Sequence, residues 1–218
     1  KVGVIAEIKR KAPSTGWLAE GVDVEQLSIA YMQAGASALS VLTDEKYFGA
    51  KTNDLQIARK YNYCPILRKD FIIDPYQVIE TRSVGADCLL LIAACLTPGK
   101  CLELSKLASS LGLEVLLEVH SREEIENYVN PHIHLIGVNN RNLKDFTTSI
   151  ERSVELSEYL PKDLTWVSES GIREAEQIQR LTDTGYKGFL IGTHFMKTNA
   201  PSHKCKELIE NSKKVCEV

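Results

Sequence analysis

The segment PILRKDF, residues 65–71, carries a pattern that recurs along the whole chain. Two aliphatic residues run directly into Arg68, Lys69 and Asp70. This is the pattern of a buried strand that ends abruptly in charge. The cation at its end points either into a site or into solvent, and the ends of the other strands decide between these two possibilities.

Seven further segments are short and rich in valine, isoleucine and leucine. Most of them are almost continuously apolar rather than alternating, which is typical of strands buried on both faces of a parallel sheet. We therefore predict eight strands, at residues 2–9, 38–43, 65–70, 88–93, 114–119, 135–140, 165–170 and 188–192.

Amphipathic segments with recognisable ends separate the predicted strands. Asp74-Pro75 and Thr97-Pro98 each pair an N-cap residue with proline at the first helical position. Several helical segments are followed by a glycine shortly before the next strand, which suits a left-handed C-terminal cap because glycine has no Cβ to clash. These glycines are Gly35, Gly85, Gly112 and Gly185. The repeated order of strand, helix and glycine indicates βα units.

Eight such units without a break in composition predict an α/β fold, a single closed (β/α)8 barrel that forms one domain over residues 1–218. A doubly wound open sheet is the alternative. It is disfavoured because no G-x-G-x-x-G turn follows the first predicted strand.

Composition excludes several classes of function. The formal net charge of −3 provides no basic surface for nucleic acid, and no apolar run reaches the length of a membrane span. The amino terminus has no signal-peptide pattern, and none of the six cysteines form a C-x-x-C motif, so we expect reduced thiols in a cytoplasmic protein. His132 and His134 lack a third ligand at a diagnostic spacing, so no metal site is predicted.

Charged residues of both signs end several predicted strands, where a (β/α)8 barrel places its chemistry. Glu7 and Lys9 share one face of the first strand because side chains alternate along a strand. Lys69 ends the third strand and Glu118 the fifth. Each residue alone is consistent with a solvated charge. Together they predict a site for acid–base chemistry, because opposite charges and partial burial shift pKa values. Arg68, one residue from Lys69, should face the helix layer.

A second predicted site lies after the last two strands, at the usual phosphate position of this fold. Ser170 and Gly171 precede a helix predicted over residues 173–181, and Gly192 and Thr193 follow the eighth strand. Small residues let backbone N–H groups approach an anion, and a helix N-terminus carries positive partial charge. Ordinary glycine turns are the alternative reading.

The long loop after the first strand, residues 9–21, contains three consecutive basic residues. Long loops in compact domains are often functional, so we interpret this loop as a mobile lid that attracts an anionic substrate. A solvated basic loop is the alternative. Tyr47 and Phe48, after the second strand, are expected at the same rim, either for stacking on an aromatic substrate or for simple packing.

Seven collinear strings that touch seven of the eight predicted strands resemble indole-3-glycerol-phosphate synthase. They are AEIKRKAPS (6–14), SVLTDEKYFGA (40–50), PILRKDFIIDPYQ (65–77), LLEVHS (116–121), IGVNNRNL (136–143), SESGI (168–172) and LIGTHFMK (190–197). The resemblance implies a carboxy-lyase of tryptophan biosynthesis that closes 1-(o-carboxyphenylamino)-1-deoxyribulose 5-phosphate to the indole with loss of carbon dioxide and water. It implies no cofactor and no metal, and we expect a monomer whose partner is this phosphorylated small molecule.

The resemblance also implies roles for four catalytic residues. Lys69 would be the general acid that protonates the ketone oxygen, and Lys9 would hold the substrate carboxylate or act as the acid of the dehydration. Glu118 would stabilise the cationic intermediate or take the ring proton, and Glu7 would orient its neighbours or help in deprotonation. How these four divide the proton transfers stays open.

The remaining implied contacts are with the substrate body and its phosphate. Substrate-binding residues would be Phe71, Asn139, Arg141, Glu169 and Ser170, and the phosphate would be held by Ser170, Gly171, Gly192 and Thr193. Asp70 is expected to orient its neighbours.

Three features depart from the family pattern. Ala12 stands where a serine is usual, and Thr193 replaces a common serine but keeps the hydroxyl. Family members usually carry several dozen residues before the first strand, and without them we expect the end of the first strand to be less covered. Two alternative functions remain: another (β/α)8 enzyme on a phosphorylated sugar, such as a phosphoribosylanthranilate isomerase, and a non-catalytic barrel that binds phosphorylated metabolites.

Overall fold

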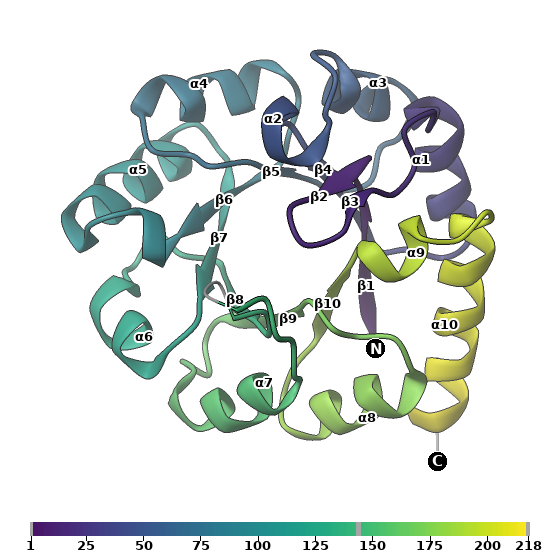
Figure 1. The fold of residues 1–218 in the computed structure, drawn as a ribbon. Coiled ribbons are helices and arrows are strands. Elements are labelled where there is room, and N and C mark those ends of the chain that lie inside the picture. Colours follow the sequence, from purple (N-terminus) through teal and green to yellow (C-terminus); the bar gives the residue numbers. More distant parts are fainter. Residues whose placement is uncertain (1, 143–144, 217–218) are drawn as a thin grey trace.

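The computed structural model describes residues 2–142 and 145–216, which form a closed barrel of eight parallel strands inside a ring of helices (Figure 1). Around the barrel the strand order is β1-β10-β9-β8-β7-β6-β5-β4, and β4 closes onto β1. The strands are β1 (Gly3–Ile8), β4 (Ala38–Leu42), β5 (Ile66–Lys69), β6 (Cys88–Ile92), β7 (Glu114–Val119), β8 (Leu135–Asn139), β9 (Thr165–Glu169) and β10 (Gly188–Ile191).

Each of these strands lies inside one of the eight predicted segments, so the predicted (β/α)8 barrel is confirmed and the open sheet is excluded. The principal helices are α1 (Val24–Gln33), α3 (Asp54–Tyr61), α4 (Pro75–Ser83), α5 (Pro98–Ser110), α6 (Arg122–Tyr128), α7 (Glu151–Leu156), α8 (Ala175–Asp183) and α10 (Pro201–Cys216). The shorter elements are α2 (Glu45–Phe48), α9 (Thr193–Met196) and the 3-10 turns η1 (Ala93–Cys95) and η2 (Ser157–Tyr159).

The helix ends follow the local sequence. Thr97 caps α5 and Asp74 caps α4, each with proline in the first turn, as predicted. The four predicted C-terminal glycines have left-handed backbone angles, with φ of 95° at Gly35, 88° at Gly85, 70° at Gly112 and 113° at Gly185. None of the described helices is long and apolar enough to cross a membrane.

One predicted boundary is wrong. The helix expected at residues 173–181 is α8, which begins only at Ala175 with Glu174 as its N-cap. The backbone N–H groups of Arg173 and Glu174 donate to Gln177 Oε1, over 2.8 and 3.1 Å. This capping interaction ends the preceding loop and starts the helix two residues later than the sequence pattern indicates.

Two hydrophobic layers result from the alternation of side chains along the strands. On each strand, alternate side chains point outward, and these residues, including Leu89, Leu91 and Val115, pack against the helices in the large outer core. The side chains between them on each strand point inward and fill the barrel interior: Leu67, Leu90, Ile92, Leu116, Val167 and Leu190. Two positions after several of these residues, the next inward-facing side chain lies at the carboxyl end of the strand. At these strand ends the inward-facing side chains are polar.

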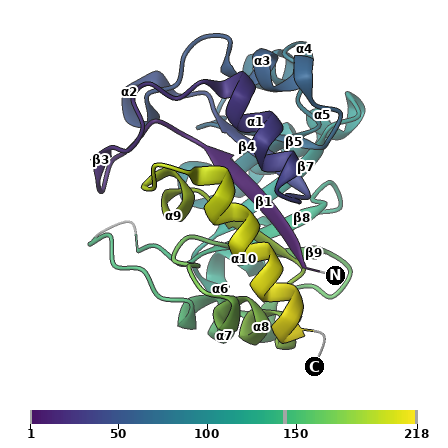
Figure 2. The same ribbon diagram turned by 90° about the vertical axis from the view of Figure 1, so that its right-hand side faces the viewer.

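The loop after β1 contains structure that the sequence did not predict. Strands β2 (Lys11–Ala12) and β3 (Gly16–Trp17) form a small antiparallel hairpin. Figure 2 shows β3 and α2 projecting at one end of the barrel, whereas both termini lie toward the other end. The hairpin therefore stands at the end where the barrel strands finish.

Candidate active site

A cavity of about 860 Å³ opens at the carboxyl ends of the barrel strands. Nearly all of the predicted site residues line it: Glu7, Lys9, Lys69, Phe71, Glu118, Asn139, Arg141, Ser170, Gly171, Gly192 and Thr193. Glu169 is the exception, because its side chain is fully buried and does not form part of the cavity wall. The convergence predicted from the strand ends is therefore present.

Lys69 is the centre of this site, because three carboxylates surround its ammonium group. Its Nζ atom donates to Glu169 Oε2 and lies 3.6 Å from Glu118 Oε2 and 3.9 Å from Glu7 Oε2. Lys9 Nζ donates to the other oxygen of Glu7 over 2.6 Å. Two ammonium groups and three carboxylates thus form one buried network at the cavity floor.

Alternation along the strands explains why these side chains meet. Lys69 follows the inward-facing Leu67 by two residues, Glu118 follows Leu116, and Glu169 follows Val167. Each charged group therefore stands directly above an interior apolar residue and points into the barrel mouth. The predicted shared face of Glu7 and Lys9 is confirmed by their hydrogen bond.

Burial and charge act against each other at Lys69 and Glu7. Burial by itself lowers the pKa of Lys69. The charges of Glu169, Glu118 and Glu7 raise it by a larger amount, so the net pKa is well above that of an ordinary lysine. Burial raises the pKa of Glu7, but Lys9 and Lys69 lower it more, and the net pKa is below the ordinary value. At neutral pH the resting site therefore holds a protonated lysine beside an ionised glutamate.

Glu169 behaves differently from the other carboxylates. Burial raises its pKa to about 7, with repulsion from Glu118 and Glu7 adding to the effect and Lys69 opposing it. Its Oε1 atom is buried without a hydrogen-bond partner. The family resemblance implies that Glu169 contacts the substrate; in the structure its side chain is fully buried and pairs with Lys69. The alternation of side chains along β9 places Glu169 at the barrel mouth. It does not reveal that the Lys69 side chain would pair with Glu169 and bury it.

We expect Glu169→Gln to flatten the pH dependence of stability between about pH 4.5 and 7. A carboxyl whose folded pKa is raised from 4.5 to about 7 stabilises the folded state at low pH, and this contribution is lost as pH rises through the folded value. Chemical unfolding of both proteins from pH 4 to 8 measures the difference. An identical difference in unfolding free energy at every pH would contradict the assigned titration.

Glycine makes room for two of these carboxylates. A Cβ atom at Gly137 would lie 2.2 Å from Glu169 Oε1, and one at Gly192 would lie 2.3 Å from Glu7 Oε1. A side chain at either glycine would force the facing carboxylate to move. The sequence analysis did not identify Gly137, because a glycine inside an apolar strand gives no signal of the carboxylate that will face it.

Asn139 and Arg141 connect the catalytic floor to the hairpin. Asn139 Nδ2 donates to Glu118 Oε1 over 3.1 Å, and its Oδ1 atom accepts from the backbone N–H of Arg141 over 3.0 Å. The Arg141 guanidinium donates to Ser14 Oγ over 3.0 Å. Ser14 belongs to the loop predicted as a lid, so the loop contacts the opposite wall of the cavity in this structure.

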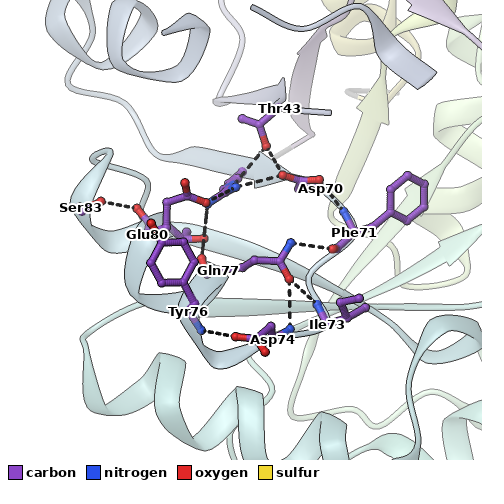
Figure 3. Close-up of polar contacts among 11 residues, drawn as sticks. Thr43, Asp70, Phe71, Ile73, Asp74, Tyr76, Gln77, Glu80 and Ser83 are labelled. Carbon is purple, nitrogen blue, oxygen red and sulfur yellow. Dashed lines mark hydrogen bonds and ion pairs between the residues drawn. The ribbon is translucent and has the colours of Figure 1, made fainter. Parts of the chain in front are cut away.

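The segment after β5 is held by a polar network that Figure 3 shows in detail. Asp70 accepts from the hydroxyl of Thr43 over 2.6 Å and from the backbone N–H of Phe71 over 2.8 Å. Gln77 Nε2 donates to the Phe71 carbonyl over 2.9 Å, and Gln77 Oε1 accepts from the N–H groups of Ile73 and Asp74 (Figure 3). Asp70 thus orients its neighbours, as predicted.

Arg68 faces away from the cavity, also as predicted. Its guanidinium pairs with Asp70 over 3.0 Å and with Glu80 over 2.7 Å, and it donates to Thr81 Oγ1 over 3.3 Å. Glu80 and Thr81 belong to α4, so Arg68 joins the strand to the helix layer. This anchoring leaves Lys69 on the opposite face, pointing into the cavity.

The far side of the cavity is rich in backbone and cationic groups. Ser170 and Gly171 both have left-handed backbone angles, with φ of 68° and 80°. Gly192 is the N-cap of α9, and Thr193 is its first residue. Arg173, His194 and Lys197 line the same end and were not among the predicted site residues. The backbone N–H groups of Arg173 and Glu174, just before α8, do not add to this end, because both donate to Gln177 Oε1.

Aromatic rings form the rim near the end of β5. Phe48 and Phe71 both line the cavity, with ring centroids 6.2 Å apart. Tyr47 packs edge-on against Phe71 at 5.9 Å but does not line the cavity. Of the predicted aromatic pair, Phe48 is therefore the ring that could stack on a substrate.

No three histidine, cysteine, aspartate or glutamate side chains within residues 2–142 and 145–216 are arranged to hold a metal ion. The three buried carboxylates instead converge on an ammonium group. Such an arrangement can deliver a proton from Lys69 and stabilise positive charge that develops near Glu118.

Solved structures with low sequence identity share this fold. A tryptophan synthase alpha subunit from Legionella pneumophila is 14% identical, with a TM-score of 0.68 over 100% of this chain and 93% of that chain. A thiamine phosphate pyrophosphorylase from Pyrococcus furiosus is 16% identical, with a TM-score of 0.71 over 98% of this chain and 96% of that chain. At these identities the likeness concerns the fold alone.

Sequence relatives are much closer. An indole-3-glycerol phosphate synthase of Bacteroides thetaiotaomicron is 50% identical over 95% of this chain and 80% of its own length. Enzymes of the same name from Bordetella pertussis and Koribacter versatilis are 42% and 45% identical, again over 80% of their lengths. The family profile described as indole-3-glycerol phosphate synthase matches residues 1–208. The chain therefore belongs to the indole-3-glycerol phosphate synthase family.

Proposed function

We propose that this cavity closes the indole ring of 1-(o-carboxyphenylamino)-1-deoxyribulose 5-phosphate with loss of carbon dioxide and water. The chain is a carbon–carbon lyase of tryptophan biosynthesis, as its family and relatives indicate. The observation that carries the assignment of roles is the position of Lys69. It lies on the cavity wall as a protonated ammonium group, among three carboxylates.

In ring closure Lys69 acts as the general acid. The ring carbon that bears the carboxylate attacks the ketone carbon, and the electron pair of the carbonyl moves onto its oxygen. That oxygen takes a proton from Lys69 Nζ. Carbon dioxide then leaves and its bonding electrons restore the aromatic ring. A positioned general acid contributes ~10²–10⁴-fold to such a step.

Dehydration needs a second acid and a base. Lys9 lines the cavity and is paired with Glu7 at 2.6 Å, so it can hold the substrate carboxylate first and protonate the leaving hydroxyl later. Glu118 stabilises the iminium-like positive charge or removes the ring proton, and Asn139 holds Glu118 through one oxygen. Glu7 orients both lysines, or shares the deprotonation, through its contacts at 2.6 and 3.9 Å.

The substrate would lie with its phosphate at the far end of the cavity and its aromatic ring at Phe48 and Phe71. The left-handed backbone at Ser170 and Gly171, with Gly192 and Thr193 across from them, supports the phosphate position. Arg141 supplies a guanidinium between the two ends. Thr193 retains the hydroxyl expected there, whereas Ala12 lines the cavity without one.

The two alternative functions fit less well. An isomerase acting on a phosphorylated sugar would share the phosphate end but would not need both Lys9 and Lys69. A non-catalytic barrel would have no use for a buried lysine among three carboxylates, since burying charges is costly. Action as a monomer in the cytoplasm belongs to the same proposal, and the six free thiols support a reducing compartment.

Fluorescence of the indole product tests this function directly. Purified protein should convert the anthranilate-derived ribulose phosphate to indole-3-glycerol phosphate without added metal or cofactor. Retention of phosphate-ligand binding without any indole product would favour the non-catalytic barrel instead.

A further inference from the structure

His120 is a buried histidine beside the catalytic cavity that the proposed mechanism does not use. It lies two residues after Glu118, just beyond the end of β7 and before α6. Its Nε2 atom is 3.6 Å from Glu118 Oε1, and its Nδ1 atom is 3.7 Å from Glu124 Oε2. The imidazole therefore stands between a carboxylate of the site and a carboxylate of the helix layer.

The local structure holds His120 in this position. Ser121 caps α6 by accepting from the backbone N–H of Glu124 over 3.2 Å. Glu124 in turn accepts from the backbone N–H of His120 over 2.5 Å. The same glutamate thus fixes the backbone of His120 and faces its ring, so the ring has little freedom to turn away from Glu118.

Both ring nitrogens are buried, yet neither makes a hydrogen bond of normal length. Buried polar atoms without partners are rare and call for an explanation. Catalytic hydrogen bonds are often long in the empty site and tighten when substrate binds. A small movement of Glu118 toward the ring would bring its Oε1 atom within hydrogen-bond distance of Nε2.

We propose that His120 is a positioning residue for Glu118: its imidazolium, held by Glu124, fixes the Glu118 carboxylate beside Lys69 and Asn139 during the reaction. Glu118 Oε1 already accepts from Asn139, and Oε2 lies near Lys69. His120 would be a second donor at Oε1 and the third donor group around this carboxylate, which leaves the carboxylate one orientation. This inference rests on the proposed function of the cavity.

The charge state of His120 depends on Glu118 of β7, Glu124 of α6 and Arg152 of α7. Two weak acids lie near the same carboxylates: Cys95 of η1, whose pKa burial, Glu118 and Glu124 raise, and Tyr128 of α6, whose pKa burial and Glu124 raise. Burial and the charge of Arg152 lower the pKa of His120, but Glu124 and Glu118 together raise it by a larger amount. The net pKa lies above the ordinary 6.5, so the imidazolium is present at lower pH and is lost as pH rises through that raised value.

Two substitutions at position 120 test the role by steady-state kinetics. His120→Leu removes the donor and should lower kcat by about 10- to 100-fold with little change in KM, the scale of a misplaced catalytic group. His120→Gln keeps a donor and should recover part of this loss. The exposed His203 on α10 provides the matched control, because His203→Gln removes a histidine that does not line the cavity.

The pH profile separates positioning from a merely structural role. The wild-type kcat should fall as pH rises through the titration of His120, and His120→Gln should lack this fall. Glu124→Gln should shift the fall to lower pH, because Glu124 raises the pKa of His120. Profiles of the same shape in all three proteins would overturn the proposal.

Histidine NMR titration tests the contact even if the wild-type protein makes no indole product, a result that would count against the proposed function alone. The His120 resonance, assigned by its loss in His120→Gln, should titrate at lower pH in Glu118→Gln than in wild type. It should also titrate at lower pH in Glu124→Gln. An unchanged His120 pKa in Glu118→Gln would overturn the inference.

Discussion

Lys69→Met should lower kcat by at least ~10²-fold, the scale on which general acids contribute. The substitution removes the proton donor for the ketone oxygen while keeping an unbranched side chain of similar length. The phosphate end of the cavity is untouched, so binding of a phosphate-bearing product analogue should persist. Stopped-flow or steady-state indole fluorescence measures the rate, and a loss below tenfold would mean that another group is the acid.

The same substitution should also change stability in a pH-dependent way. Without Lys69 the carboxyls of Glu7, Glu118 and Glu169 face one another with a partner missing, and breaking a buried pair costs about 3–5 kcal/mol. The cost should be largest above pH 7, where Glu169 is ionised in the wild type, and should shrink as the carboxyls take up protons at lower pH.

Lys100→Met is the matched control for this change. Lys100 pairs with Glu103 over 3.0 Å on the exposed surface of α5, where an ion pair contributes only ~0–1 kcal/mol. Its kcat and its pH dependence of unfolding should equal those of the wild type. A similar loss in both variants would assign the effect to lost surface charge rather than to the buried network.

Gly137→Ala should impair catalysis although Gly137 does not line the cavity. Its Cβ would lie 2.2 Å from Glu169 Oε1 and 3.2 Å from Leu116 Cδ1, so Glu169 must move. Because Glu169 holds Lys69, we expect kcat to fall by ~10²-fold, as for a misplacement of about 1 Å. Overpacking of the barrel interior should cost about 1–3 kcal/mol of stability.

A double-mutant cycle shows whether this effect acts through Glu169. If it does, Glu169→Ala and the Gly137→Ala/Glu169→Ala double variant should have equal kcat, because the shortened side chain leaves space for the new methyl group. Gly99→Ala on α5 is the control, since a Cβ there meets nothing within 4 Å. Additive losses in the cycle would show that Gly137 matters for another reason.

The strands and the identity of most site residues could be predicted because they depend on local patterns. Continuous apolar runs mark strands buried on both faces, and each predicted segment contains an observed strand. Alternation then assigns side chains to faces, which correctly placed Lys69 in the cavity and Arg68 against α4. The prolines at helix starts and the glycines at helix ends affect only the few residues next to them, so the helix ends that they set could also be predicted.

Contacts between distant segments could not be predicted in the same way. Lys69 and Glu169 are 100 residues apart and meet only because the barrel closes. The space at Gly137, the contact of Ser14 with Arg141 and the position of His120 between two carboxylates all depend on neighbouring strands or loops. Helix α8 starts late because Gln177 Oε1 accepts from the backbone N–H of Arg173. The sequence pattern had placed this N–H group at the helix N-terminus, facing an anion.

The amino-acid sequence was thus sufficient to predict the architecture and the residues at the barrel mouth. Both depend on the spacing of apolar residues and on the prolines and glycines at helix ends, which are properties of short segments. The ionisation of those residues was settled by tertiary structure. Carboxylates on other strands raise the pKa of Lys69 against the opposing effect of burial, whereas burial and neighbouring carboxylates raise that of Glu169. These surroundings exist only in the closed barrel, and they keep the ammonium group at the end of PILRKDF protonated at neutral pH.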